Sequence, residues 1–286
     1  MHAARPAACI FVLSIILNRS VIQVVKDDSI KYLVFDIESV PDADLIRKVK
    51  YPGLELDDRD AIMRFQEEIL TNSNGSSYFI PVTFQIPVSL CIALVRSDYS
   101  IADIISLDEP EFRMEEITRL FWDLVEKKYK DASMITFNGR GFDVPLMELM
   151  AFRYGYTASR HFKDKFAGRY RFGTKHIDIH DWLSNYNAVR MQGGLNLLAK
   201  VLGKPGKMGT SGDDVYDLYV ERNLERINQY CIHDVLDTYF VFLRTRVLMG
   251  ELTFEQEQSI INTARNWMEE TVDSQPAFPE YLENWT

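Results

Sequence analysis

The strongest constraint on the fold is a pair of carboxylates at the end of an apolar strand. Residues 31–37 (KYLVFDI) are predicted to form a strand, because aromatic and branched residues lead into Asp36 after a charged KDD segment. Alternate side chains of a strand share one face, so Asp36 and Glu38 point the same way, while Phe35 and Ile37 face the opposite layer. Two carboxylates on one buried face repel each other unless a cation lies between them. Taken alone, this pattern is also typical of a solvated strand end.

A third carboxylate, Asp143, follows the turn N-G-R-G-F-D between a predicted strand and a predicted helix. There its side chain is suited to cap the helix by accepting hydrogen bonds from free backbone N–H groups. The turn also brings Asn138 and Arg140 to the carboxyl end of a core strand, where open α/β sheets place their ligands. We expect Phe142 to pack beneath and to fix the direction of Asp143. Asn138, Arg140 and Phe142 are therefore candidate substrate-binding residues.

The fourth carboxylate, Asp234, lies one helical turn after Tyr230 in a predicted long helix, so the two share a face. A Tyr–Asp hydrogen bond on a packed helix is common without any catalytic role. His233 lies about 100° round the helix from Asp234, and we interpret it as a surface or core polar residue. Each cluster is weak evidence alone. Together, in this order and on these element types, they indicate a site for hard divalent ions such as Mg²⁺, which take carboxylate and phosphate oxygens as ligands.

The composition is that of a soluble globular domain: 286 residues, 47% hydrophobic and 26% charged. A net charge of −10 excludes a protein that coats nucleic acid nonspecifically, because that mode requires the neutralisation of many phosphates. Three cysteines, Cys9, Cys91 and Cys231, are too few for a disulfide framework or a zinc site. We interpret them as buried apolar residues and expect a reducing compartment, the cytoplasm.

Residues 1–30 are predicted to be an N-terminal extension. Their apolar run AACIFVLSIIL is shorter than the roughly 20 residues of a membrane span, so no membrane partner is expected. Only His2 and Arg5 precede the run, and no small-x-small cleavage site follows it, which makes it a weak secretory signal. A surface strand or helix, or a start codon placed too early, are the alternatives.

The order of the remaining elements favours an α/β class with a ribonuclease-H-like fold, a mixed five-stranded sheet flanked by helices. Further strands are expected at residues 88–96, 101–107, 133–137 and 177–179, the first two joined by a tight SDYS turn as an antiparallel pair. Helices are expected at residues 112–129, 145–154, 180–186, 195–202, 214–221 and 224–249. Gly250 then ends the last of these helices.

Residues 31–250 are predicted to be the main domain. Within them, residues 39–80 are polar and charged, with one helical pattern at 61–70 before an NSNGSS loop, and are predicted to be a peripheral insertion. Residues 251–286 are predicted to be a helical tail, with a helix at 254–268 that loosens into SQPAFPEYLENW.

Cations and aromatic rings alternate in a separate segment, residues 160–176. Cations follow a phosphate backbone and aromatic faces stack bases, which is the usual combination for binding single strands. A solvated loop anchored by its aromatic residues is an equally good interpretation. Arg169, Tyr170 and Arg171 are the candidate substrate-binding residues of this segment.

FDIES, NGRGFD and YCIHD resemble the three motifs of the DEDD superfamily of 3′-5′ exonucleases. HIDIHDWL and GLNLLAKVLGKPGKMG resemble the corresponding stretch of stand-alone exonucleases related to the proofreading domain of family-B DNA polymerases. The resemblance covers about residues 31–250. Tyr230 lies four residues before Asp234, and Gln229 stands where the other branch has histidine, which is typical of the tyrosine branch (DEDDy). Asp178, within HIDIHDWL, is interpreted as a structural residue near the site.

The resemblance implies a metal-dependent 3′-5′ exonuclease that hydrolyses phosphodiester bonds at 3′ ends and releases 5′ mononucleotides. Asp36, Glu38 and Asp234 would hold the Mg²⁺ or Mn²⁺ ion that generates the nucleophile, and Asp36 would bridge to a second ion held by Asp143, largely through water. Tyr230 would hydrogen-bond and orient the attacking water. A phenol with an ordinary pKa near 10 is a poor base, so most of the activation of the water would come from the metal.

Two other functions are weighed against this one: a catalytically silent nucleic-acid-binding module of the same fold, and a partner-binding role for residues 39–80 and the tail. The first is disfavoured because all four carboxylates and Tyr230 are present. DNA is the expected substrate, RNA is the open alternative, and protein partners are unknown. Single-stranded 3′ ends are expected to be preferred, since a paired end must first unpair at a cost of a few kcal/mol.

Overall fold

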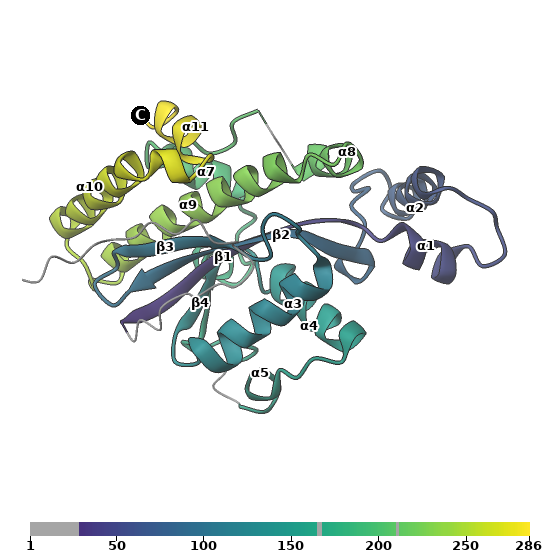
Figure 1. Cartoon of the computed structure of the whole chain (residues 1–286), viewed down its shortest axis with the longest axis horizontal. Helices are drawn as coiled ribbons and strands as arrows, with labels where there is room; N and C mark the ends of the chain where they lie inside the picture. Colours follow the sequence, from purple (N-terminus) through teal and green to yellow (C-terminus); the bar gives the residue numbers. More distant parts are fainter. Residues whose placement is uncertain (1–28, 165–167, 210–211) are drawn as a thin grey trace, which may run out of the picture.

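A five-stranded mixed sheet forms the centre of the computed structural model, which describes residues 29–164, 168–209 and 212–286. Its spatial order is β3-β2-β1-β4-β5, and Figure 1 labels the first four of these strands. The strands are β1 (Ile30–Pro41), β2 (Gln85–Arg96), β3 (Ile101–Ser106), β4 (Ser133–Thr136) and β5 (His176–Asp178). β2 is antiparallel to both β1 and β3, whereas β4 runs parallel to β1 and to β5. The predicted mixed sheet is confirmed. Cys9 and all but the last two residues of the predicted extension lie outside the described ranges, and Ile30, the last of these two, already belongs to β1.

Helices cover both faces of this sheet (Figure 1). On one face, α3 (Met114–Asp123) and α4 (Asp143–Tyr154) pack on Leu33, Phe35 and Ile37 of β1. On the other face, α9 (Leu224–Leu248) packs on Val34, the neighbour of those side chains in the strand alternation. Because side chains alternate along β1, Asp36 and Glu38 continue the row of Val34 and face the α9 side.

Shorter elements complete the two layers. A π-helical turn, η2 (Leu124–Lys128), extends α3, so the single helix predicted at residues 112–129 is divided. The other helices of this part are α5 (Ser159–Lys163), α6 (Ile179–Leu183), α7 (Gly194–Val201) and α8 (Val215–Val220), with short 3₁₀ turns η1 (Val82–Phe84) and η3 (Gly212–Asp214). In the described part of the chain, every helix is too short or too polar to cross a membrane.

The C-terminal segment is more ordered than the sequence predicts. After α10 (Phe254–Glu270) and the turn η4 (Val272–Ser274), the chain forms α11 (Phe278–Glu283) instead of loosening. Phe278 and Tyr281 are buried against α9, and the Tyr281 hydroxyl donates to Asp237 Oδ1 at 2.7 Å. The prediction that this segment loosens was wrong. Its prolines and polar residues suggested a loop, but Phe278 and Tyr281 are three positions apart, which is the spacing of one helix face.

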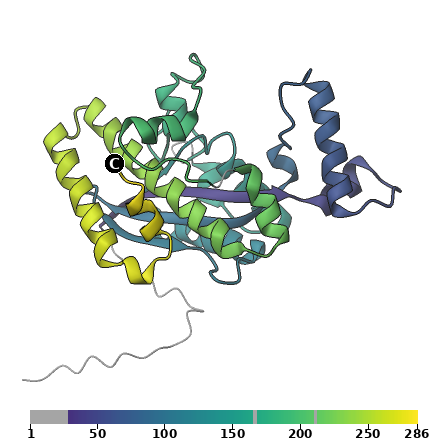
Figure 2. The same ribbon diagram turned by 90° about the horizontal axis from the view of Figure 1, so that it is seen from above.

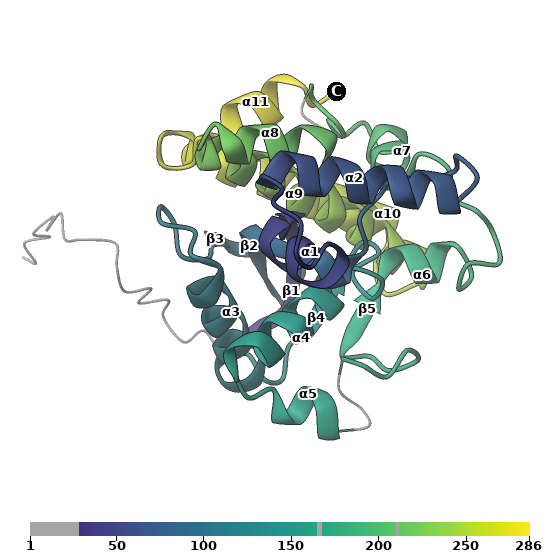
Figure 3. The ribbon, with the colours of Figure 1, turned by 90° about the vertical axis from the view of Figure 1, so that its right-hand side faces the viewer.

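Two helices between β1 and β2 stand beyond one end of the sheet (Figure 2), and Figure 3 views the molecule from this end. α1 (Ala43–Lys50) and α2 (Asp58–Asn72) enclose a small core of their own, built around Ile46, Ile62 and Ile80. β1 continues to Pro41, past the predicted start of the insertion. This separate core holds the two helices at the end of the sheet where Asp36 and Glu38 lie.

Candidate active site

Asp36 and Glu38 lie on β1 opposite Cys91 and Ser89 of β2, so their position is set by strand pairing at the centre of the sheet. The Cys231 thiol of α9 donates to the Asp36 carbonyl oxygen at 3.3 Å, which ties the helix to this point of the strand. A carboxylate oxygen of Asp36, one of Glu38 and the Cys231 sulfur all lie within 4.8 Å of one another. The two carboxylates predicted to share a face do converge on one spot beneath α9.

The turn after β4 carries Asp143 to the same place. Asn138 adopts a left-handed backbone (φ 65°), and a Cβ on Gly139 would lie 2.5 Å from the Thr136 Cβ, so a residue without a side chain is required there. Asp143 is the first residue of α4, and the preceding cap residue, Phe142, makes no side-chain capping bond. The Asp143 carboxylate instead accepts from its own N–H and from the N–H of Ile37 on β1. Asp143 is therefore the first helical residue rather than the N-cap of α4, and its role as a metal ligand stays a prediction.

Asp178, at the end of β5, holds this turn in shape. Its carboxylate accepts from the backbone N–H of Asn138 at 2.9 Å and of Arg140 at 2.8 Å, and from the N–H of Asp181 at 3.2 Å. Asp178 is buried, so these three N–H groups take the place of water as hydrogen-bond donors to its carboxylate. The interpretation of Asp178 as a structural residue agrees with these contacts.

Replacing Asp178 by alanine is expected to lower the free energy of unfolding by about 3 kcal/mol, because buried N–H groups lose a charged acceptor. Urea denaturation of the variant measures this loss. The exposed Asp273 provides a matched control, since Asp273→Ala should change stability by less than about 0.5 kcal/mol. Equal stability of the two variants would show that Asp178 does not support the turn.

Tyr230 and Asp234 project from α9 toward the strand carboxylates, and the Tyr230 hydroxyl donates to Asp234. Burial raises the pKa of Tyr230 well above its usual value, and the negative charges of Asp234, Glu38 and Asp36 raise it further. The phenol therefore keeps its proton across the pH range of any assay and acts as a hydrogen-bond donor rather than a base.

The ionised forms of the four carboxylates are unfavourable in the fold. Burial, followed by mutual repulsion, raises the pKa of Asp36 and Glu38 well above their usual values. Burial raises the pKa of Asp143 to about 7 and of Asp234 to about 6, the latter held down in part by the Tyr230 hydrogen bond and by Lys207. Such a set of buried carboxylate oxygens gains stability from a hard divalent cation, so the residues present fit Mg²⁺ or Mn²⁺.

Cys231 is the softer member of this cluster. Burial raises the pKa of its thiol well above the usual value, so the sulfur stays protonated and makes a poor ligand for a hard ion. The thiol is therefore suited to packing, and the predicted metal ligands remain the carboxylates.

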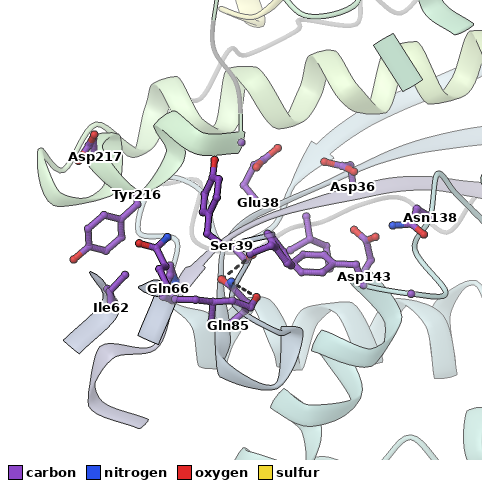
Figure 4. Close-up of a pocket in the computed structure, with 18 of the residues that line it drawn as sticks. Asp36, Glu38, Ser39, Ile62, Gln66, Gln85, Asn138, Asp143, Tyr216 and Asp217 are labelled. Carbon is purple, nitrogen blue, oxygen red and sulfur yellow. Dashed lines mark hydrogen bonds between the residues drawn. The ribbon is translucent and has the colours of Figure 1, made fainter. Parts of the chain in front are cut away.

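Two hollows meet at the carboxylates. A cleft of about 720 Å³ is lined by Asp36, Glu38, Asn138, Phe142 and Asp143 together with residues of α2 and α8 (Figure 4). A second hollow of about 330 Å³ shares Asp36 and Asn138 and adds Tyr230, Asp234, Lys207 and Asp237. Each of the four carboxylates thus lines at least one of these two hollows, and Asp36 lines both.

The second hollow also contains Asp237, which was missed in the sequence, and Lys207, which was noted only as a cation of a glycine-rich loop and not as a residue near the carboxylates. Burial raises the pKa of Asp237 to about 7, although the hydrogen bond from Tyr281 opposes this shift. Asp237 lies three residues after Asp234 on the same helix, and that spacing was the available signal. Lys207 lies in a glycine-rich loop with no helical or strand pattern, so its approach to Asp234 had no local signal.

The structure does not bring the predicted cationic residues to the carboxylates. The Arg140 guanidinium forms an ion pair with Asp181 at 3.2 Å and donates to the carbonyl oxygens of Gly168 and His176. Arg171 also bonds Asp181, at 2.9 Å. None of these arginines lines the two hollows. A substrate-binding role for Arg140 and Arg171 stays a prediction, and their contacts in the structure are internal.

The same holds for the residues next to Arg171. Arg169 pairs with Glu148 of α4 at 2.9 Å, and Tyr170 is half exposed at the surface. Neither residue lines the hollows beside the carboxylates. Among the predicted substrate-binding residues, only Asn138 and Phe142 lie in the cleft.

Comparison with known families agrees with this geometry. A family described as a predicted 3′-5′ exonuclease related to the exonuclease domain of PolB matches residues 77–285, whereas no curated protein matches the chain. The match contains the Asn138–Asp143 turn, all of α9 and nearly all of the C-terminal segment, so it extends past the predicted limit at residue 250. Asp36 and Glu38 precede the matched range and are joined to it by the pairing of β1 with β2 and β4. The chain belongs to this family of predicted 3′-5′ exonucleases related to the exonuclease domain of PolB.

Proposed function

We propose that the chain is a divalent-metal-dependent 3′-5′ exonuclease of the tyrosine branch of the DEDD superfamily, acting on DNA. The observation that carries the proposal is the convergence of four carboxylates from β1, α4 and α9, two of them buried and two half-buried, on two adjoining hollows that share Asp36. A purely structural cluster would be expected to pair these charges with lysine or arginine, because unpaired buried carboxylates destabilise a fold.

The chemistry follows from the donor set. Asp36, Glu38 and Asp234 would hold one ion, and Asp36 with Asp143 would hold the other. When bound, two such ions supply Lewis-acid activation of the attacking water and charge stabilisation for the leaving 3′ oxygen. The roles of the chain's own residues are then to position the ions, to orient the water and to seat the terminal nucleotide.

Tyr230 is the residue proposed to orient the water. Its protonated hydroxyl lies beside Asp234 and faces the second hollow. Because its one proton is donated to Asp234, the phenol oxygen would accept a hydrogen bond from the water and so orient it for in-line attack on the terminal phosphodiester, without taking up its proton.

Replacing Tyr230 by phenylalanine is expected to slow turnover by up to roughly 100-fold, since only one hydrogen bond in the site is lost. Single-turnover rates measured at saturating Mn²⁺ test this expectation. The metal concentration that gives half-maximal activity should be unchanged, because no ligand oxygen is removed. Unchanged turnover would assign Tyr230 to packing alone.

A single-stranded substrate end suits the volume of the site. A cleft of about 720 Å³ falls in the range of roughly 300–1,000 Å³ that ligand pockets span, so it admits the terminal nucleotides rather than a length of duplex. A paired end would have to separate first at a cost of a few kcal/mol. We therefore propose that unpaired, frayed and mismatched 3′ ends are degraded faster than blunt duplex.

End-labelled oligomers test the proposed reaction. A 5′-labelled single strand of DNA should shorten stepwise in Mg²⁺ or Mn²⁺ with release of 5′ mononucleotides, and a 3′-phosphate block should slow it. The matching RNA strand compares the two substrate classes. Attack on a circular single strand at a comparable rate would indicate an endonuclease, and strand binding without hydrolysis would indicate the catalytically silent module.

A further inference from the structure

Two large aromatic side chains are exposed beside the carboxylates. Phe79 is 58% exposed and Tyr78 is 49% exposed, and both line the cleft that contains Asp36, Glu38 and Asp143. They belong to the segment that leads from α2 into β2, within the insertion predicted to be peripheral. Exposed apolar groups gathered at a cleft are typical of binding surfaces.

This segment is held firmly against the sheet. The next residue, Ile80, is buried in the small core of α1 and α2, and its carbonyl oxygen accepts from Gln85 Nε2 at 3.1 Å. The Phe79 ring lies 5.8 Å from the ring of Phe142, the residue before Asp143. The position of Phe79 relative to the carboxylate edge is therefore set by the fold, although its ring is open to solvent.

The side of the cleft formed by α2 suits nucleobases better than phosphates. α2 contributes Ile62, the exposed Met63 and the amide of Gln66 to the cleft. Gln66 and Ile62 lie at the end of the cleft away from Asp143 and Asn138 (Figure 4). Arg59, also on this wall, lies 3.6 Å from the Asp217 carboxylate of α8, so its charge is partly balanced.

We propose that Phe79, with Tyr78 beside it, is a stacking platform for the terminal nucleobases of the substrate strand. The proposal rests on the proposed function, because it assumes that a 3′ end enters the cleft. Every base has a π-face, so stacking on such a platform is tolerant of sequence and requires unpaired bases. The α1–α2 insertion is then a part of the substrate site that selects single-stranded ends.

The segment at residues 160–176 is the competing platform. Tyr170 and Phe172 are exposed there, but neither lines the hollows that contain the carboxylates. A base stacked on Phe79 lies next to the terminal phosphodiester, whereas a base on Tyr170 would lie farther along the strand.

Binding measurements on base-deleted strands test the platform directly. The probe is a 5′-fluorescein single strand of DNA with a phosphorothioate at its 3′-terminal linkage, in Mg²⁺, and a matched strand lacks the two 3′-terminal bases. For the wild-type protein, deleting the bases should weaken binding roughly tenfold. Phe79→Ala should weaken binding of the complete strand by a similar factor, and deleting the bases should then cause a much smaller further loss, the part that stacking on Tyr78 retains.

Phe152→Ala is the matched control, because Phe152 is 88% exposed on α4 and lines neither hollow. It should bind both strands as the wild type does, and thermal unfolding should show that both variants remain folded. The inference would be overturned if Phe79→Ala bound the complete strand as tightly as the wild type. It would also be overturned if deleting the terminal bases weakened binding to Phe79→Ala as much as to the wild type but had no effect on binding to Tyr170→Ala. Failure of the proposed function is seen separately, as absence of hydrolysis of an unmodified strand by the wild-type protein.

Discussion

Replacing Asp36 by asparagine is expected to reduce nuclease turnover by on the order of 1,000-fold or more. The reason is that this carboxylate is proposed to contact both ions, which stabilise the negative charge of the transition state. The substitutions Glu38→Gln, Asp143→Asn and Asp234→Asn are expected to be nearly as severe. Each keeps the shape of the side chain and removes one negative charge. Initial rates on a 5′-labelled single strand, with Asp273→Asn as the control, measure the effect.

The same Asp36 variant should be more stable than the wild type in the absence of metal at pH 7.5. Burial and the charges of Asp143, Glu38 and Asp234 raise the pKa of Asp36, so its ionised form is unfavourable in the fold. An active Asp36→Asn protein, or full activity in EDTA, would contradict the assignment of the site.

Divalent metal is expected to raise the melting temperature by roughly 5 °C at pH 7.5 and to have little effect at pH 4.5. Burial raises the pKa of Asp143 to about 7 and of Asp234 to about 6, above the value near 3.9 of an unfolded aspartate. The folded state therefore binds more protons than the unfolded state, and the resulting stability is present below about pH 4 and is lost as the pH rises through 6 to 7. A metal present at a free concentration 100 times its dissociation constant adds about 2.7 kcal/mol to the free energy of unfolding.

Thermal unfolding in Mg²⁺, Mn²⁺ and EDTA at the two pH values tests this expectation. Asp143→Asn should flatten the pH dependence of the metal-free protein and weaken the effect of the metal. If the metal raises the melting temperature of Asp143→Asn and Asp234→Asn as much as that of the wild type, it binds elsewhere.

The parts of the site that were predictable from sequence are those with a local pattern. Strand alternation placed Asp36 and Glu38 on one face, and the one-turn spacing placed Tyr230 beside Asp234. Their convergence follows from the order of the sheet, which the alternation of strands and helices already favoured. Asp143 was ambiguous because a carboxylate at a helix start serves equally well as a cap or as a ligand.

The rest depends on contacts between distant segments. Arg140 is paired with Asp181, which follows it by about forty residues, so the sequence could not show that its charge is used internally. Tyr78 and Phe79 lie in a polar insertion whose packing is set by a second small core, and nothing local indicates that they line the cleft. Such placements come from tertiary packing rather than from periodicity.

We propose that Asp36, Glu38, Asp143 and Asp234 act together on two divalent ions at a terminal phosphodiester. Anomalous scattering from crystals grown with Mn²⁺ and a single strand that carries a 3′-terminal phosphorothioate tests it most directly. We expect two manganese peaks beside the terminal linkage. One should be contacted by oxygens of Asp36, Glu38 and Asp234, and the other by an oxygen of Asp36 and, largely through water, by Asp143. The absence of a peak among these carboxylates, at a Mn²⁺ concentration that supports hydrolysis, would contradict it.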